Sequence, residues 1–276
     1  MFLNYLYQDQ LFSSLSHHQV TSGTWQDSLF WAFISSISLV LASIVGAKYQ
    51  PGEKITSYLL AFTSGVLIAL LSYDLMEVSF NISGYLPTTI GFFLGILIYI
   101  LTNRWVESLG CKSRHSAKHG GCHKEGKKPP SFSLLIGALI DGLPEAASIG
   151  ISLLENKIVS ASVIAAVALA NIPEGLASGA GLKKSGFSYK NIIFIWSLVV
   201  IACTLSSFLS YTFLKDVEPY IQATLIAFAG GGVLAMTLQT VIPEAYKEAH
   251  DLVSIFGAFG FGVAFFLSHG SQYFHN

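Results

Sequence analysis

The sequence predicts an all-α integral membrane protein with eight membrane-spanning helices. Of its 276 residues, 52% are hydrophobic and only 11% are charged, whereas a soluble domain carries about 25% charged residues. Each span is close to or above the roughly 20 apolar residues that a helix needs to cross a bilayer. Asp, Glu, Lys and Arg are absent from 28–47, 55–73, 78–103, 191–214, 219–243 and 252–276. These features disfavour a soluble enzyme, and the net charge of −1 gives no basic field for a nucleic-acid partner.

Charged residues also delimit the helices along the chain. The first helix ends at Lys48, the second begins after Lys54, and the third ends near Arg104. The fourth and fifth are interrupted only by acids, the sixth lies between two lysines, and the last two follow Glu218 and Asp251. We predict one membrane domain over 1–276, with helices at 28–47, 55–80, 85–106, 131–153, 158–182, 190–214, 219–246 and 252–273.

A faint internal repeat suggests how these helices are arranged. The stretch Ala-Phe-Thr-Ser-Gly-Val-Leu-Ile-Ala at 61–69 is similar to Ala-Phe-Ala-Gly-Gly-Gly-Val-Leu-Ala at 227–235. If the repeat is real, three helices at each end flank a central pair, the fourth and fifth, in a 3+2+3 arrangement. Transporters place their binding site at such a repeat interface near the bilayer midplane.

The basic residues predict the orientation. If the N-terminus lies outside, every Lys and Arg except Lys157 and Lys215 falls on the inner side. Because inner loops are enriched in Lys and Arg, we expect both termini outside, in a multi-pass protein of the cell (plasma or inner) membrane in contact with the lipid bilayer. The longest connection, 108–130, then becomes a cytoplasmic loop rich in His, Cys and Lys.

This loop offers candidate ligands for metal capture. Thiols and imidazoles suit zinc or copper, although their spacing fits no closed structural zinc site. The alternative is a solvated loop whose histidines are incidental. The candidates are Cys111, His115, His119, Cys122 and His123.

Acidic residues inside the spans carry the main functional signal. A charge at the bilayer centre costs at least about 2.5–3.5 kcal/mol, so such residues are usually functional. No Lys or Arg lies deep in any span to pair with them. A bound cation or a proton relay would explain the cluster, and protonated structural carboxyls are the remaining alternative. The acids are Asp74, Glu77, Asp141, Glu145, Glu174 and Glu244.

Three of these acids directly follow a proline, namely Glu145, Glu174 and Glu244. A proline inside a helix releases the carbonyl four residues earlier, here those of Ile140, Leu169 and Gln239. Asp141 and Glu145 share one helix face, as do Asn171 and Glu174. Glycines near Pro144 and Pro173 would let the fourth and fifth helices pack side by side, so that their polar side chains form one oxygen-rich cluster.

The proline motifs resemble those of a known family. Ala170-Asn-Ile-Pro-Glu-Gly is similar to the (H/Q)-(N/D)-x-P-E-G signature of the ZIP family of divalent metal transporters. Asp141-Gly-Leu-Pro-Glu-Ala resembles the companion H-N-x-P-E-G motif on the preceding helix. Eight spans, outer termini and a His-containing cytoplasmic loop are also typical of that family. The resemblance, to a divergent member of bacterial type, implies one or two metals bound at mid-membrane by the fourth and fifth helices, and a homodimer, since family members often pair.

The chain departs from the family at several ligand positions. Asp141 replaces the usual His, Gly142 an Asn, and Ala170 a His or Gln, while Thr240 stands where an acid is common. A primary site made of Asp141, Glu145, Asn171 and Glu174 would therefore be all-oxygen. We hypothesise that Asp74, which the repeat aligns with Thr240, supplies a missing carboxylate, with Glu77 one turn on. Gln239 and Glu244 of the seventh helix are further candidate ligands.

The predicted function is transport of a divalent cation into the cytoplasm. Zn²⁺ is expected as the transported substrate, with Fe²⁺, Mn²⁺ or Cd²⁺ as alternatives. An all-oxygen site favours the harder ions Mn²⁺ and Fe²⁺. We expect no enzyme activity, because the chain contains neither His-Glu-x-x-His nor a phosphate-binding loop. The alternative is a proton or cation channel, or a proton-coupled transporter, that uses the same acids. The expected mechanism is a rocking or elevator-like motion of the central helices against the flanking repeats.

Overall fold

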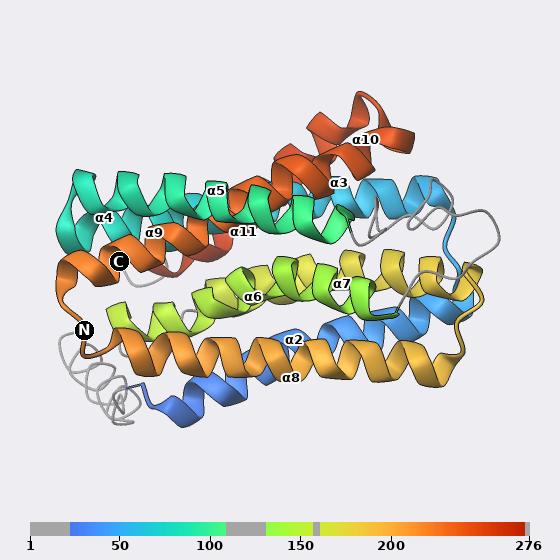
Figure 1. Ribbon diagram of the computed structural model, residues 1–276. Helices are drawn as coiled ribbons and strands as arrows, with labels where there is room; N and C mark the ends of the chain where they lie inside the picture. Colours follow the sequence, from blue (N-terminus) through green and yellow to red (C-terminus); the bar gives the residue numbers. More distant parts are fainter. Residues whose placement is uncertain (1–22, 109–130, 157–160, 274–276) are drawn as a thin grey trace, which may run out of the picture.

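The computed structural model describes residues 23–108, 131–156 and 161–273, and all regular secondary structure in these ranges is helical (Figure 1). The predicted all-helical class is therefore confirmed. The elements are α2 (Trp25–Tyr49), α3 (Glu53–Ala69), the π-helix η1 (Leu70–Met76), α4 (Glu77–Ser83), α5 (Tyr85–Ser108), α6 (Ser131–Asn156), α7 (Ala161–Lys184), α8 (Tyr189–Leu214), α9 (Pro219–Met236), the π-helix η2 (Thr237–Val241), α10 (Ile242–Ala249) and α11 (Leu252–Tyr273).

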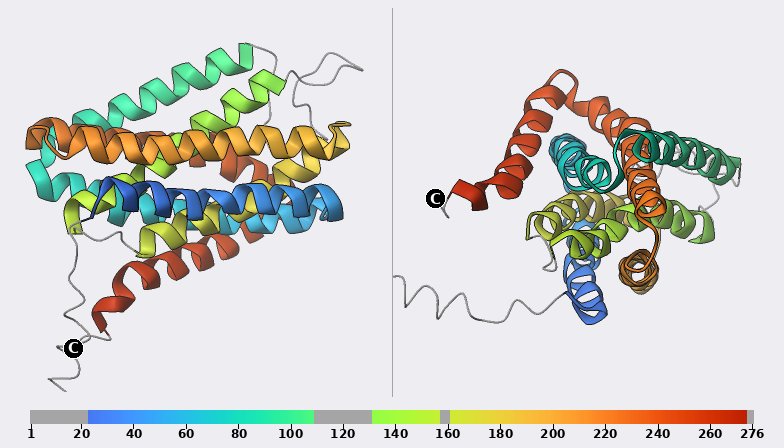
Figure 2. Two further views of the ribbon diagram at one scale, coloured as in Figure 1. Left: turned by 90° about the horizontal axis from the view of Figure 1, so that it is seen from below. Right: turned by 90° about the vertical axis from the view of Figure 1, so that its left-hand side faces the viewer.

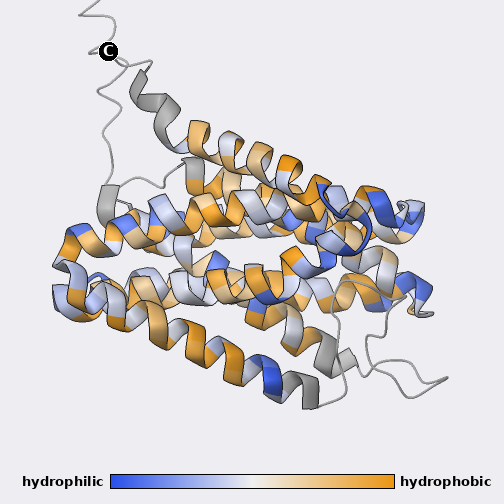
Figure 3. Ribbon diagram, turned by 90° about the horizontal axis from the view of Figure 1, so that it is seen from above, coloured by the Kyte–Doolittle hydropathy of each residue, from blue (hydrophilic) through white to orange (hydrophobic). Residues whose placement is uncertain are grey.

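Seven helical stretches of the described chain are long and apolar enough to cross a membrane, which makes this a multi-pass membrane protein. Hydrophobic residues cover most turns of the helices, and hydrophilic residues gather mainly towards one end of the bundle (Figure 3). The apolar part of α11, Leu252–Ser268, is shorter, so the eighth span stays a prediction. The seven stretches are Trp25–Tyr49, Glu53–Ser83, Tyr85–Trp105, Leu135–Leu154, Val163–Lys184, Tyr189–Leu214 and Pro219–Ala249.

Local sequence signals set the ends of several helices. Thr24 caps α2 in a reciprocal pair with Asp27: the Asp27 backbone N–H donates to the Thr24 hydroxyl, and the Thr24 backbone N–H donates to the Asp27 carboxylate. Gly84 joins α4 to α5 in a single residue with a φ of 77°, a left-handed conformation that glycine adopts without strain. This tight corner reverses the chain between the second and third spans.

The helices divide into two groups. The α2 group comprises α2, α6, α7 and α8, with α7 packed on α2 and α6 packed on α8. The α3 group comprises α3–η1–α4, α5, α9–η2–α10 and α11, with α5 packed on α9 and α11 packed on α3. Figures 1 and 2 show α6 and α7 in the middle, with α2 and α8 on one side and the α3 group on the other.

This division differs from the expected 3+2+3 arrangement in one respect. The fourth and fifth spans, α6 and α7, are central. However, α6 packs mainly on α8 and α7 mainly on α2, and the two central helices contact each other much less. The reason is that their glycines face α2 and α8. Gly179 of α7 lies against the Ser43 backbone of α2, and Gly150 of α6 lies against the Ser207 backbone of α8.

The packing nevertheless follows the internal repeat. The α2–α7 contact corresponds to α8–α6, and α3–α11 corresponds to α9–α5. Gly65 of α3 approaches the Gly257 backbone of α11, and its repeat partner Gly231 approaches the Phe92 backbone of α5. The two π-helices, η1 and η2, also occur at corresponding places, each interrupting a long span just after the repeated nine-residue stretch.

Candidate metal centre

The four residues of the predicted primary site are all buried within the bundle. Asp141 and Glu145 of α6 are 1% and 2% exposed, and Asn171 and Glu174 of α7 are 3% and 8% exposed. Pro144 and Pro173 lie inside their helices, as the sequence predicts. Each acid therefore lies within a turn of a position where the helix loses one backbone hydrogen bond.

Packing on the outer helices holds α6 and α7 in place. A Cβ atom at Gly175 would meet the Leu39 carbonyl oxygen of α2 at 2.7 Å, and one at Gly142 would meet the Cys203 sulfur of α8 at 3.0 Å. Such close approach is possible only where the side chain is a hydrogen atom. The faces next to the acids are thus fixed against the rest of the α2 group.

Hydrogen bonds fix two of the four side chains. The Asn171 amide nitrogen donates to the Ser35 carbonyl oxygen of α2 at 3.1 Å, so the amide oxygen is the atom suited to a cation. The Tyr99 hydroxyl of α5 donates to Asp141 Oδ1 at 2.9 Å. The same hydroxyl lies 3.3 Å from the hydroxyl of Thr240 on η2. Asp141 is thereby tied to two elements of the α3 group.

Negative charge is concentrated around Glu145. Its carboxylate lies near enough to Glu174 and to Asp141 to be repelled by each of them when the groups are ionised. Within the described part of the chain, Glu145 Oε2 is buried and has no hydrogen-bond partner. A buried carboxylate oxygen in that position is costly without a proton or a cation.

The carboxylates do not form a closed ligand cage in this arrangement. Among residues 23–108, 131–156 and 161–273, no three His, Cys, Asp or Glu side chains converge closely enough to hold a metal ion together. A cation would have to draw the acids of α6 and α7 towards one another. The arrangement can supply oxygen ligands, but only after the side chains reorient.

The remaining predicted residues lie elsewhere in the α3 group. Asp74 is half-buried on η1, Glu77 is exposed at the start of α4, and Glu244 is 8% exposed on α10. Gln239 is exposed and its amide oxygen accepts from Asn103 at 3.5 Å. Their role as ligands stays a prediction. The loop candidates Cys111, His115, His119, Cys122 and His123 lie outside the described residues.

One residue near the site, Tyr99, was missed by sequence reasoning. Tyr99 has a signal that could have revealed it, because it continues a four-residue spacing that begins with Gly91 and Gly95. The Cys203 thiol of α8 is buried in an apolar cluster and packs against Gly142.

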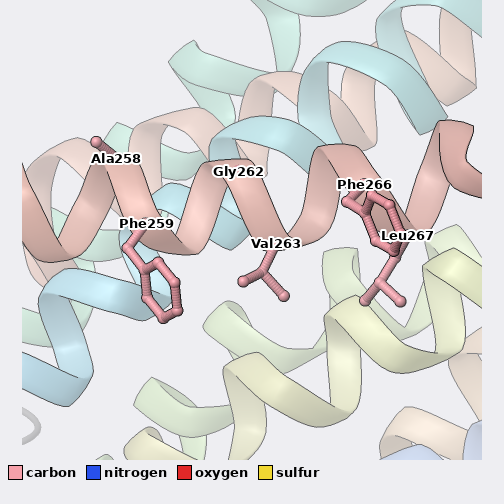
Figure 4. A pocket seen from close by; sticks show the side chains of 6 residues that line it. All are labelled: Ala258, Phe259, Gly262, Val263, Phe266 and Leu267. Atoms are coloured by element: carbon pink, nitrogen blue, oxygen red, sulfur yellow. The ribbon is translucent and has the colours of Figure 1, made fainter.

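A groove along α11 is chemically unlike this centre. It has a volume of about 410 Å³ and is lined by Ala258, Phe259, Gly262, Val263, Phe266 and Leu267 (Figure 4). None of these side chains offers a ligand for a cation. The acids of α6 and α7 therefore remain the better candidate for a functional site.

Comparison with known proteins gives a partial similarity. No protein-family model matches the chain. Protein zntB of Dictyostelium discoideum is 29% identical over 110 residues, which cover 37% of this chain and 30% of that protein. The chain thus matches about 30% of the length of this curated relative. It is a helical, multi-pass membrane protein with a buried acidic centre and a partial similarity to zntB.

Proposed function

We propose that the protein carries divalent metal cations across the cell membrane into the cytoplasm and is not an enzyme. One observation carries the proposal: Asp141, Glu145, Asn171 and Glu174 are buried together on two proline-interrupted helices in the middle of a membrane bundle. The resemblance of their motifs to the ZIP family and the partial similarity to zntB support it.

A cation would relieve the main electrostatic problem of the site. Glu145 is repelled by two neighbouring carboxylates, and one of its oxygens is buried without a hydrogen bond. An ion between the acids turns this repulsion into attraction and replaces its own hydration shell with carboxylate and amide oxygens. Zn²⁺ is the expected substrate, with Fe²⁺, Mn²⁺ and Cd²⁺ as alternatives. Asp74, Glu77, Gln239 and Glu244 are proposed as further ligands along the path.

The division into two helix groups supports a moving carrier. Asp141, Glu145, Asn171 and Glu174 all belong to the α2 group, which could shift as a unit against the α3 group. Such a shift would expose the same site first to one side of the membrane and then to the other. The moving unit therefore includes α2 and α8, and not only the two central helices first expected.

A proton pathway is the second candidate, and one observation favours it. Within the described residues the acids are not gathered into a three-ligand cage. Separated carboxyl groups can pass protons without one, and the same acids could couple proton movement to transport.

Uptake into liposomes tests the proposal. The reconstituted protein should take up Zn²⁺ in a saturable way, with competition from Mn²⁺, Fe²⁺ and Cd²⁺ but not from Mg²⁺ at equal concentration. Glu174→Gln should abolish uptake, whereas the control Glu218→Gln, at the exposed start of α9, should leave it intact. Proton flux without metal uptake, lost in Glu174→Gln, would establish the second candidate instead.

A further inference from the structure

A hydrogen bond joins the two helix groups at the candidate site. The Tyr99 hydroxyl of α5 donates to Asp141 Oδ1 of α6 at 2.9 Å and lies 3.3 Å from Thr240 Oγ1 of η2. Tyr99 is 4% exposed and Asp141 is 1% exposed. Because the acceptor is a carboxylate in a low-dielectric interior, this contact is stronger than an ordinary neutral hydrogen bond.

The packing of α5 explains why the hydroxyl reaches this place. Gly91, Gly95 and Tyr99 follow one another at four-residue spacing and share one helix face. The two glycines lie against the backbone of α9 at Thr224 and Phe228. With α5 held this close to α9, the next residue on the same face extends past α9 towards α6.

We propose that Tyr99 is a positioning residue that orients Asp141 for cation binding, with Thr240 supporting its hydroxyl. This inference rests on the proposed function and adds a residue to it. A carboxylate that binds a metal ion usually also accepts a hydrogen bond from a neighbouring group that does not bind the ion. That hydrogen bond fixes which lone pairs of the carboxylate face the ion. Tyr99 holds one carboxylate oxygen and so leaves the group in a defined orientation.

The site then combines a fixed ligand with an adjustable one. Asp141 is held by Tyr99, whereas Glu145 Oε2 has no hydrogen-bond partner among the described residues. An arriving ion would bind the oriented carboxylate and draw Glu145 towards it. Because Tyr99 belongs to the α3 group and Asp141 to the α2 group, the orientation exists only in the relative position of the groups seen here.

The test compares Tyr99→Phe with wild type in Zn²⁺ uptake by proteoliposomes. The substitution removes the hydroxyl and keeps the ring, so packing is preserved. Losing such a partner typically costs roughly 10–100-fold in metal affinity, so KM should rise by that factor while the maximal rate changes little. Thr240→Val should raise KM by a smaller factor.

Matched controls separate positioning from general damage. Tyr211→Phe removes a hydroxyl that donates to the Gly23 carbonyl far from the acids, and Thr237→Val removes one that donates within its own helix to Val233. Both should keep the wild-type KM. In an Asp141→Ala background, Tyr99→Phe should add no further rise in KM, because the acceptor that Tyr99 orients is gone.

The outcomes distinguish this inference from the proposed function. Saturable wild-type uptake with an unchanged KM in Tyr99→Phe would overturn the role of Tyr99 and leave the transporter intact. A Tyr99→Phe effect on KM that is equally large in the Asp141→Ala background would also overturn it. Absence of saturable metal uptake by the wild type would overturn the proposed function, and the positioning role with it.

Discussion

At the scale of single residues, the acids that bind a cation should destabilise the protein when the cation is absent. Glu145 is 2% exposed, lies near two other carboxylates and carries an oxygen without a hydrogen bond in the described structure. Interactions of this kind are unfavourable until the ion arrives, and functional sites often keep them at a cost in stability. Removing the charge of Glu145 should therefore impair transport without lowering the stability of the ion-free protein.

Glu145→Gln should abolish metal uptake and leave the metal-free protein at least as stable as the wild type. The amide keeps the shape of the side chain but removes its charge from a buried, repulsive setting. Thermal unfolding in detergent without metal measures the stability, and proteoliposome uptake measures the function. Glu248→Gln, near the end of α10, is the control and should change neither. A clear fall in unfolding temperature for Glu145→Gln would assign this acid a structural role.

At the scale of the elements, close contacts between backbones hold the α2 group together. A Cβ atom at Gly179 would overlap the Ser43 carbonyl oxygen of α2. Small residues at such crossings let membrane helices pack closely and gain van der Waals contact. The position of α7, and therefore of Asn171 and Glu174, depends on this approach.

Gly179→Ala should destabilise the protein by about 1–3 kcal/mol, because the added methyl group must push α7 away from α2. Gly262→Ala on α11 is a matched control, since its Cβ would meet nothing within 4 Å. Thermal unfolding of the two variants under the same conditions compares them directly. Equal unfolding temperatures would show that the α2–α7 contact is looser than described.

The elements also show what the sequence could and could not predict. The all-helical class and seven spans followed from hydrophobic runs delimited by charges, which depend only on the bilayer thickness. The π-helices could not be predicted, because hydrophobic composition does not distinguish them from α-helix. The pairing of α6 with α8 and α7 with α2 was also missed, since a glycine shows that some backbone comes close but not which one.

The same limit applies to the candidate site. The acids of α6 and α7 were identifiable because a buried charge next to a proline is unusual in a membrane helix. Tyr99 was missed, because its spacing from Gly91 and Gly95 places it on a close-packed helix face but does not indicate its partner, which lies 42 residues away on another helix. It stays a prediction that the transported cation is also bound by Asp74, Glu77, Gln239 and Glu244.

At the scale of the whole molecule, the orientation can be tested with the native cysteines. The positive-inside pattern predicts that Cys111 and Cys122 lie in the cytoplasm, and Cys203 is buried. A membrane-impermeant maleimide should therefore label the protein only after cells are made permeable. Asp216→Cys, between α8 and α9, should be labelled in intact cells. Labelling of the wild type in intact cells would contradict the predicted orientation.

The movement of one helix group against the other is a second property of the whole molecule. Lys184 at the end of α7 pairs with Glu53 at the start of α3, with Nζ and Oε1 3.7 Å apart. In a Cys111→Ser, Cys122→Ser background, a short bismaleimide bridging Lys184→Cys and Glu53→Cys should stop uptake. The matched pair Ser28→Cys and Ser207→Cys lies within the α2 group, where the two hydroxyls are 2.8 Å apart.

Oxidation of this second pair to a disulfide should leave uptake intact, because α2 and α8 would move together. The Lys184–Glu53 ion pair is partly exposed and is worth at most about 1 kcal/mol, so each single substitution should also transport normally. Undiminished uptake with the two groups bridged would show that transport needs no relative movement between them.

The proposed transport requires a divalent cation to bind between the acids of α6 and α7. Crystals grown with Cd²⁺ and measured near the cadmium absorption edge would locate the ion by anomalous scattering. We expect a peak about 2.0–2.6 Å from carboxylate oxygens of Glu145 and Glu174, which should be absent from crystals of Glu174→Gln. Peaks confined to the 108–130 loop or to the ends of the bundle would contradict it.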